Sequence, residues 1–123
     1  MAKILLVDDD DSMRLFIGGA LERAGYDVTM ADRGAVALPL IVPGEYDLLL
    51  SDIMMPEMDG IELAQRAVAL CPSIRVMFIT GFAAVALNRM GGVPPVDATV
   101  LSKPFHLRDL VVQVDRIFQE NAA

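Results

Sequence analysis

Four short apolar runs in the chain each end at residues suited to phosphoryl chemistry. Carboxylates, a hydroxyl group and an ammonium group follow the runs in chain order, as Asp8 and Asp9, then Asp52, Thr80 and Lys103. A short apolar run between turn residues is typical of a buried parallel strand. Ligands of an open α/β sheet bind beyond the carboxyl ends of its strands. These side chains are therefore predicted to meet at one edge of a sheet, where they would suit a phosphate and a divalent metal ion.

The chemistry of such an edge follows from its charges. Three neighbouring carboxylates, on Asp8, Asp9 and Asp52, repel one another by a few kcal/mol per pair. Mg²⁺ relieves this repulsion, because it is a hard cation that takes oxygen ligands and keeps several waters. Asp52 can then act as a nucleophile toward a phosphoryl group, with the metal neutralising charge on the transferring oxygens. Lys103 supplies a positive charge to one of those oxygens, and Thr80 a hydrogen bond.

The order of apolar segments predicts the elements that position these residues. The five expected strands are Lys3–Val7, Tyr26–Ala31, Leu48–Ser51, Val76–Ile79 and Thr99–Ser102. Helical periodicity predicts helices from Met13 to Ala24, over Arg33–Val42, Met58–Leu70 and Ala83–Met90, and from Leu107 to Phe118. Alternating strands and helices favour one α/β domain, a doubly wound five-stranded parallel sheet of order 2-1-3-4-5, as in flavodoxin-like proteins. The switch point then lies between the strands that end at Asp8 and at Asp52.

Several local features refine this prediction. Asp11 or Ser12 is the expected N-cap of the first helix. Phe16 falls on the apolar stripe of that helix, and Pro39 interrupts the weaker second helix. Pro104 is expected to follow Lys103 through a cis peptide bond. Cys71 is expected to be exposed or half-buried.

Composition excludes several classes of protein. The net charge is −7 and the calculated pI is about 4.4, which argues against a nucleic-acid partner. No apolar run approaches the roughly 18 residues of a membrane span, so no membrane insertion is expected. A single cysteine among 123 residues fits a reducing, cytoplasmic environment. The length predicts one domain, over residues 1–121, with no output domain.

The joint spacing of four motifs resembles a known family. Val7-Asp8-Asp9-Asp10, Asp52-Ile-Met-Met-Pro56-Glu-Met-Asp59-Gly60, Thr80-Gly81 and Lys103-Pro104-Phe105 are similar to motifs of the CheY-like receiver domains of two-component response regulators. The resemblance covers nearly the whole chain. It implies that the chain accepts a phosphoryl group from a histidine kinase or a histidine phosphotransferase, in the presence of Mg²⁺.

The resemblance also assigns roles to individual residues. It implies that Asp52 is the phosphoacceptor and that Thr80 and Lys103 bind the acyl phosphate. The metal ligands that it implies are Asp8, Asp9, Asp52 and the backbone carbonyl of Met54, with Asp9 a direct ligand. Such a protein is not an enzyme acting on other molecules, since it catalyses only its own phosphorylation and a slow dephosphorylation.

A narrower resemblance concerns the second half of the chain. The segments Phe78–Asn88 and Val100–Arg108 are similar to the CpdR-type single-domain regulators of alphaproteobacteria. This resemblance implies phosphorylation through a phosphotransferase relay. It also implies that the unphosphorylated form primes the ClpXP protease, through its ClpX unfoldase, for selected substrates. The output surface would carry Phe82, Val85, Leu87, Arg89, His106 and Arg108.

One position departs from the general receiver pattern. Receivers usually carry Tyr or Phe three residues before the lysine, and its ring turns inward when the hydroxyl residue moves toward the phosphate. The chain has Val100 at this position. Valine has no ring to turn, so another residue, Phe82 or Phe105, would have to replace the aromatic switch.

Two other classes of function compete with the receiver. Leu5–Ser12 also fits the nucleophile motif of haloacid-dehalogenase-like phosphatases, with Asp8 as nucleophile and Asp10 as general acid, and Val76–Thr80 fits their second motif. The missing later acidic pair and the short chain weigh against this alternative. The other alternative is an interaction module that never binds phosphate, against which the complete set of site residues weighs.

Overall fold

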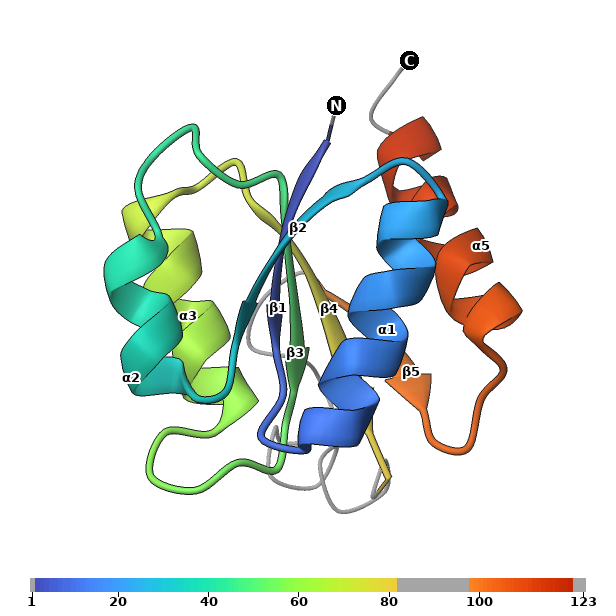
Figure 1. Cartoon of the computed structure of the whole chain (residues 1–123). Helices are drawn as coiled ribbons and strands as arrows, with labels where there is room; N and C mark the ends of the chain where they lie inside the picture. Colours follow the sequence, from blue (N-terminus) through green and yellow to red (C-terminus); the bar gives the residue numbers. More distant parts are fainter. Residues whose placement is uncertain (1, 82–97, 121–123) are drawn as a thin grey trace.

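The computed structural model describes residues 2–81 and 98–120 of the chain (Figure 1). Five parallel strands form one sheet in the order β2-β1-β3-β4-β5, which confirms the predicted fold class. The strands are β1 (Lys3–Val7), β2 (Asp27–Ala31), β3 (Leu48–Asp52), β4 (Arg75–Thr80) and β5 (Ala98–Ser102). The helical segments are α1 (Asp11–Arg23), α2 (Gly34–Ala37), the 3₁₀ turn η1 (Leu38–Leu40), α3 (Gly60–Leu70) and α5 (Leu107–Glu120).

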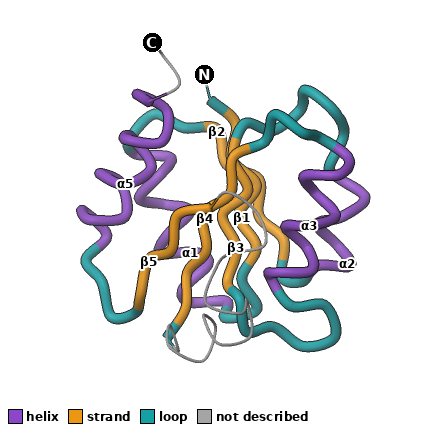
Figure 2. The backbone as a smooth tube through the Cα atoms, turned by 180° about the vertical axis from the view of Figure 1, so that it is seen from behind, coloured by secondary structure: helices purple, strands orange, loops and turns teal. Residues whose placement is uncertain are grey.

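Helices cover both faces of the sheet, and this divides the core in two. In Figures 1 and 2, α1 and α5 lie on one face while α2 and α3 lie on the other. Alternate residues of β1 serve the two halves: Leu5 and Val7 pack toward α3, whereas Ile4 and Leu6 pack toward α1 and α5. All four side chains are fully buried. A strand buried on both faces explains why these segments are continuously apolar rather than alternating.

Two helix predictions need correction. The second helix was expected over Arg33–Val42 with an interruption at Pro39; the interruption is confirmed, but α2 already ends at Ala37 and only the 3₁₀ turn Leu38–Leu40 follows it. Pro39 lies in that turn, where its missing N–H and its ring do not allow an α-helix to continue. The N-cap of α1 is Asp10, not Asp11 or Ser12, and its side chain accepts a hydrogen bond from the Met13 N–H.

Other expectations have mixed outcomes. The peptide bond between Lys103 and Pro104 is cis, as predicted. Cys71 is buried with only 2% of its surface exposed, contrary to expectation, because the end of α3 turns it into the core beside β4.

The predicted helix Ala83–Met90 lies outside the described residues. Within the part of the chain that the structure describes, no helix is long and apolar enough to cross a membrane.

The loop between β3 and α3 has one unfavourable backbone conformation. Glu57 adopts a φ of 68°, and it is the one non-glycine residue with positive φ in the described ranges. This left-handed region costs an ordinary L-residue about 1–2 kcal/mol, whereas glycine adopts it freely. The loop connects Asp52, at the end of β3, directly to α3, so its conformation helps to fix the position of α3 next to Asp52.

We expect Glu57→Gly to raise the free energy of unfolding by about 0.5–1 kcal/mol. Glycine removes the steric cost at this φ, and this gain exceeds the larger conformational entropy that glycine loses on folding. Urea denaturation of the wild type and the variant measures the difference. Glu57→Ala is the matched control, since it removes the carboxylate but keeps Cβ. Equal stabilisation by both substitutions would show that the charge, and not the backbone, limits stability here.

Candidate functional site

The structure brings the three predicted carboxylates together at the carboxyl ends of β1 and β3. Oxygen atoms of Asp8, Asp9 and Asp52 all lie within 4.8 Å of one another. Asp8 and Asp52 are buried, with 1% and 7% of their surfaces exposed, whereas Asp9 is exposed. The strand pairing of Val7 with Ser51 causes this proximity, because it places the residues that follow each strand side by side. The group can hold a metal ion through one oxygen of each residue.

Asp8 is the most constrained of the three. Its Oδ1 accepts a hydrogen bond of 2.9 Å from the backbone N–H of Asp10, whereas its Oδ2 is buried without a hydrogen-bond partner among the described residues. Burial raises the pKa of Asp8 to about 6; the Asp10 N–H opposes this shift, and the nearby charge of Asp52 adds to it. A buried carboxylate oxygen without a partner is costly, so this atom is suited to a cation or a proton.

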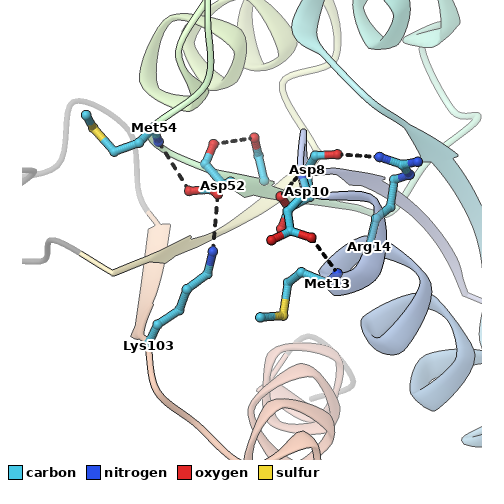
Figure 3. A network of polar contacts seen from close by, with 8 residues as sticks. Asp8, Asp10, Met13, Arg14, Asp52, Met54 and Lys103 are labelled. Carbon is cyan, nitrogen blue, oxygen red and sulfur yellow. Dashed lines mark hydrogen bonds and ion pairs between the residues drawn. The ribbon is translucent and has the colours of Figure 1, made fainter.

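Lys103 faces Asp52 from the other side. Its Nζ lies 3.3 Å from Asp52 Oδ2, and both side chains are largely shielded from solvent. The other carboxylate oxygen, Oδ1, accepts a hydrogen bond of 3.2 Å from the backbone N–H of Met54. Figure 3 shows Lys103 reaching Asp52 from below, while Asp8 lies beside Asp52 on the side away from Met54. One acidic side chain therefore lies between a fixed cation and a potential metal site.

The cluster opens into a cavity of about 390 Å³. Its lining includes the Asp9, Asp10, Asp52, Met54, Gly81 and Lys103 side chains or backbone. The cavity gives a small phosphate-bearing molecule access to Asp52 between the candidate metal ligands and Lys103. Asp10 also reaches this cavity, although the sequence suggested no role for it in a receiver.

Thr80 and Met54 are placed less directly. Thr80 ends β4, next to β3, and is fully buried one residue before Gly81. Its backbone carbonyl accepts a hydrogen bond of 2.7 Å from the Lys103 N–H, which ties the hydroxyl residue to the lysine residue. Met54 is 42% exposed beside Asp52. The roles of the Thr80 hydroxyl and the Met54 carbonyl stay predictions.

Sequence reasoning missed the residues that hold the Asp52 backbone. The hydroxyl of buried Ser51 donates a hydrogen bond of 2.9 Å to the Asp52 carbonyl. A Cβ on Gly60 would lie 2.1 Å from that same carbonyl oxygen, so only glycine fits there. The helix was expected from Met58, but α3 begins at Gly60 with Asp59 as its N-cap. That glycine also lets α3 begin directly against the peptide of Asp52.

A second cavity, of about 560 Å³, lies beside the acidic site and is mostly apolar. Its lining includes Met13, Phe16, Gly81, Lys103, Pro104, Phe105 and Leu107. Phe16 was expected on the apolar stripe of α1, and it is 64% exposed. Phe16 lines this cavity together with Lys103, so the apolar surface lies next to the acidic site.

Comparisons with known proteins agree with this architecture. A family model described as "Response regulator receiver domain" matches residues 4–115. The response regulator receiver protein CpdR of Brucella abortus is 56% identical over 117 residues, which cover 95% of this chain and 97% of that protein. The sensor kinase CckA of the same organism is 37% identical over 123 residues. This match covers 97% of this chain but only 13% of the kinase.

Solved structures lead to the same family. A CheY-like receiver domain from Methanospirillum hungatei superposes with a TM-score of 0.86 at 31% identity, and the match covers 98% of this chain and 95% of that one. The chain therefore belongs to the response regulator receiver domain family of two-component systems. Phosphorylation of an aspartate is a feature of that family.

The geometry also weighs against the phosphatase alternative. That alternative requires Asp8 as the nucleophile, but Asp8 is only 1% exposed and, among the described residues, Asp52 and not Asp8 lines the cavity. It also requires Asp10 to be a free general acid, but the Asp10 side chain caps α1. Asp52 and not Asp8 is the carboxylate that faces Lys103.

The raised pKa of Asp8 predicts how the metal-free protein responds to pH. A carboxyl group that binds its proton more tightly when folded stabilises the fold at low pH and loses that contribution as the pH rises toward about 6. We expect Asp8→Asn to stabilise the protein at about pH 7.5 and to stabilise it much less at about pH 4, near the pKa of an unfolded-state aspartate, because the cost of ionising folded Asp8 develops only between that pKa and about 6. Chemical denaturation in EDTA at both pH values measures this. The same gain at both values would show that Asp8 does not titrate as inferred.

Proposed function

We propose that the chain is a phosphorylation-dependent switch in which Asp52 accepts the phosphoryl group with the help of Mg²⁺. The observation that carries this proposal is the position of Asp52 between Lys103 Nζ, at 3.3 Å, and the oxygens of Asp8 and Asp9. In-line phosphoryl transfer needs positive charge on the transferring oxygens and an oriented nucleophile. Lys103 supplies one charge, and a metal bound by the carboxylates supplies the other.

Each residue has a distinct part in this proposal. Asp9 is the direct Mg²⁺ ligand, because it is exposed toward the cavity. Asp8 holds the ion from the buried side through its unpartnered Oδ2. Asp52 and the Met54 carbonyl complete the protein ligands. When bound, Mg²⁺ neutralises the carboxylates and shields the phosphoryl oxygens, while Thr80 donates a hydrogen bond to the acyl phosphate.

The phosphodonor is a histidine kinase or a histidine phosphotransferase. Membership in the receiver family supports this class of partner, as does the similarity to part of a sensor kinase. The donor has to bring a phosphohistidine to the cavity above Asp52, so it must cover the surface next to it. The exposed apolar cavity around Phe16 adjoins that entrance and presents Lys103 and Pro104 in its wall. We propose it as the surface that the donor protein covers.

We propose that the chain acts in the cytoplasm as a single-domain regulator. Its signal then leaves through a surface of the chain itself. The similarity to CpdR over nearly the full length of both chains supports this role. We infer that the unphosphorylated form binds the ClpX unfoldase and that phosphorylation withdraws the binding surface. His106 and Arg108 are exposed at the start of α5, as that surface requires. Its other expected members, Phe82, Val85, Leu87 and Arg89, lie outside the described residues.

Labelling with acetyl phosphate tests the phosphoacceptor directly. We expect Mg²⁺-dependent incorporation of one phosphoryl group, mapped to Asp52 by mass spectrometry, and none in Asp52→Asn. Asp52→Asn is the matched control because it keeps the size of the side chain and removes the nucleophile. Label at Asp8 would support the phosphatase alternative instead. A wild-type protein that takes no label would support the phosphate-independent interaction module.

The donor surface predicts a difference between large and small phosphodonors. We expect Phe16→Ser to slow phosphorylation by a phosphotransferase protein about tenfold or more, because an exposed aromatic anchor of an interface is lost. The rate with acetyl phosphate should stay unchanged, since this small donor needs no docking surface. Leu15→Ser is the control, because Leu15 is equally exposed at 63% on α1 but does not line the cavity. Equal slowing by both variants would refute the assignment of this surface.

The inverted switch predicts the behaviour of a protein that cannot be phosphorylated. Asp52→Ala should retain ClpX constitutively in a pull-down, whereas wild type should release it when acetyl phosphate and Mg²⁺ are added. The same treatment of Asp52→Ala controls for direct effects of the donor on ClpX. Binding of ClpX only by the phosphorylated wild type would contradict the inverted switch, while leaving Asp52 as the phosphoacceptor.

A further inference from the structure

The candidate metal ligands lie on a loop that one arginine holds in place. Arg14, in the first turn of α1, donates a hydrogen bond of 2.8 Å from Nη1 to the backbone carbonyl of Asp8. Its Nη2 lies 2.6 Å from Asp11 Oδ1. Figure 3 shows the side chain of Arg14 reaching back along α1 to the end of β1. One guanidinium group therefore joins both ends of the loop that carries Asp9 and Asp10.

This arrangement differs from an ordinary surface ion pair. The Arg14 side chain is only 16% exposed, whereas its partner Asp11 is 81% exposed. A surface pair three residues apart in a helix contributes little by itself. The bond from Nη1 leaves the helix and reaches six residues back, to a carbonyl of a buried residue. A planar guanidinium can make both bonds at once from a fixed fork, which a lysine ammonium cannot reproduce.

The carbonyl that Arg14 binds belongs to the peptide unit between Asp8 and Asp9. The orientation of this peptide sets the direction in which the Asp9 side chain leaves the backbone. Within residues 2–81 and 98–120, no hydrogen bond or ion pair holds the Asp9 carboxylate itself. Its place in the cluster therefore depends on the backbone. We propose that Arg14 is a positioning residue for metal binding, which fixes the Asp8–Asp9 peptide so that Asp9 reaches the ion.

This inference rests on the proposed function, and it makes a prediction opposite in sign to simple electrostatics. A cation next to an acidic site repels a metal ion, so loss of the Arg14 charge alone would tighten Mg²⁺ binding. Loss of positioning weakens it instead. Residues that orient metal ligands from behind typically change metal affinity by about 10- to 100-fold when they are replaced.

The test is calorimetric titration of the full chain with Mg²⁺, for wild type, Arg14→Met and Arg14→Lys. We expect Arg14→Met to weaken Mg²⁺ binding about tenfold or more. Arg14→Lys should also weaken it, because the charge is kept but the two-pronged geometry is lost. Arg66→Met is the control, since Arg66 is an exposed helical arginine in a surface pair with Glu62 on α3. This variant should bind Mg²⁺ as wild type does.

A second readout separates positioning from general damage to the fold. At saturating Mg²⁺, the maximal rate of Asp52 phosphorylation by acetyl phosphate should stay within about threefold of wild type in Arg14→Lys, since Asp52 ends β3 and Lys103 follows β5, both away from the Arg14 loop. The Asp10 amide, which donates to Asp8 Oδ1, should exchange with deuterium faster in both Arg14 variants than in wild type. If Arg14→Met does not fold, Arg14→Lys carries the test through both readouts.

The possible outcomes discriminate between the two levels of the proposal. If Arg14→Met and Arg14→Lys bind Mg²⁺ as tightly as wild type or more tightly, the positioning role is overturned and the proposed function stays intact. Equal weakening in Arg66→Met would overturn it as well, because the effect would then not be specific to this loop. A wild-type protein that binds no Mg²⁺ would overturn the proposed function itself, and the role of Arg14 with it.

Discussion

Repulsion among Asp8, Asp9 and Asp52 is the constraint on which the rest of this structure depends. Their oxygens lie within 4.8 Å of one another, and burial of Asp8 raises its pKa to about 6. Carboxylates kept this close need protons or cations as partners. Lys103 supplies one permanent positive charge, 3.3 Å from Asp52. In the proposed function, a metal ion balances the remaining negative charge and, once bound, helps the site accept a phosphoryl group.

The apolar sheet makes this unfavourable cluster possible. Each half of the core packs fully buried strand residues against two helices. The free energy gained by this apolar burial offsets the electrostatic cost of the carboxylates at the edge of the sheet. Local contacts then limit the movement of each acidic residue. Ser51 and Gly60 enclose the Asp52 carbonyl, and Arg14 binds the Asp8 carbonyl. These contacts hold the backbone of the site, while the exposed carboxylate of Asp9 stays available to a ligand.

The sequence predicted what depends on short-range patterns. Apolar runs located the strands, and the residues that follow them located Asp8, Asp9, Asp52 and Lys103 at one edge, as the structure confirms. It did not predict features that depend on how elements meet in space. Phe16 fits a helical stripe but is exposed, because burial depends on which elements cover α1 and no local pattern records this. The contact of an arginine with a carbonyl six residues back likewise depends on the path of the loop.

The most direct test of this account is Mg²⁺ binding by two acidic variants of the same loop, Asp9→Asn and Asp10→Asn. Asn caps a helix as well as Asp does, so Asp10→Asn keeps the N-cap of α1 and removes only a charge. We expect Asp9→Asn to lose most of the Mg²⁺ affinity and Asp10→Asn to keep it within about threefold, because of these two residues only Asp9 belongs to the carboxylate cluster. Equal losses in the two variants would contradict it, since the acidic loop would then attract cations as a diffuse field without a defined site.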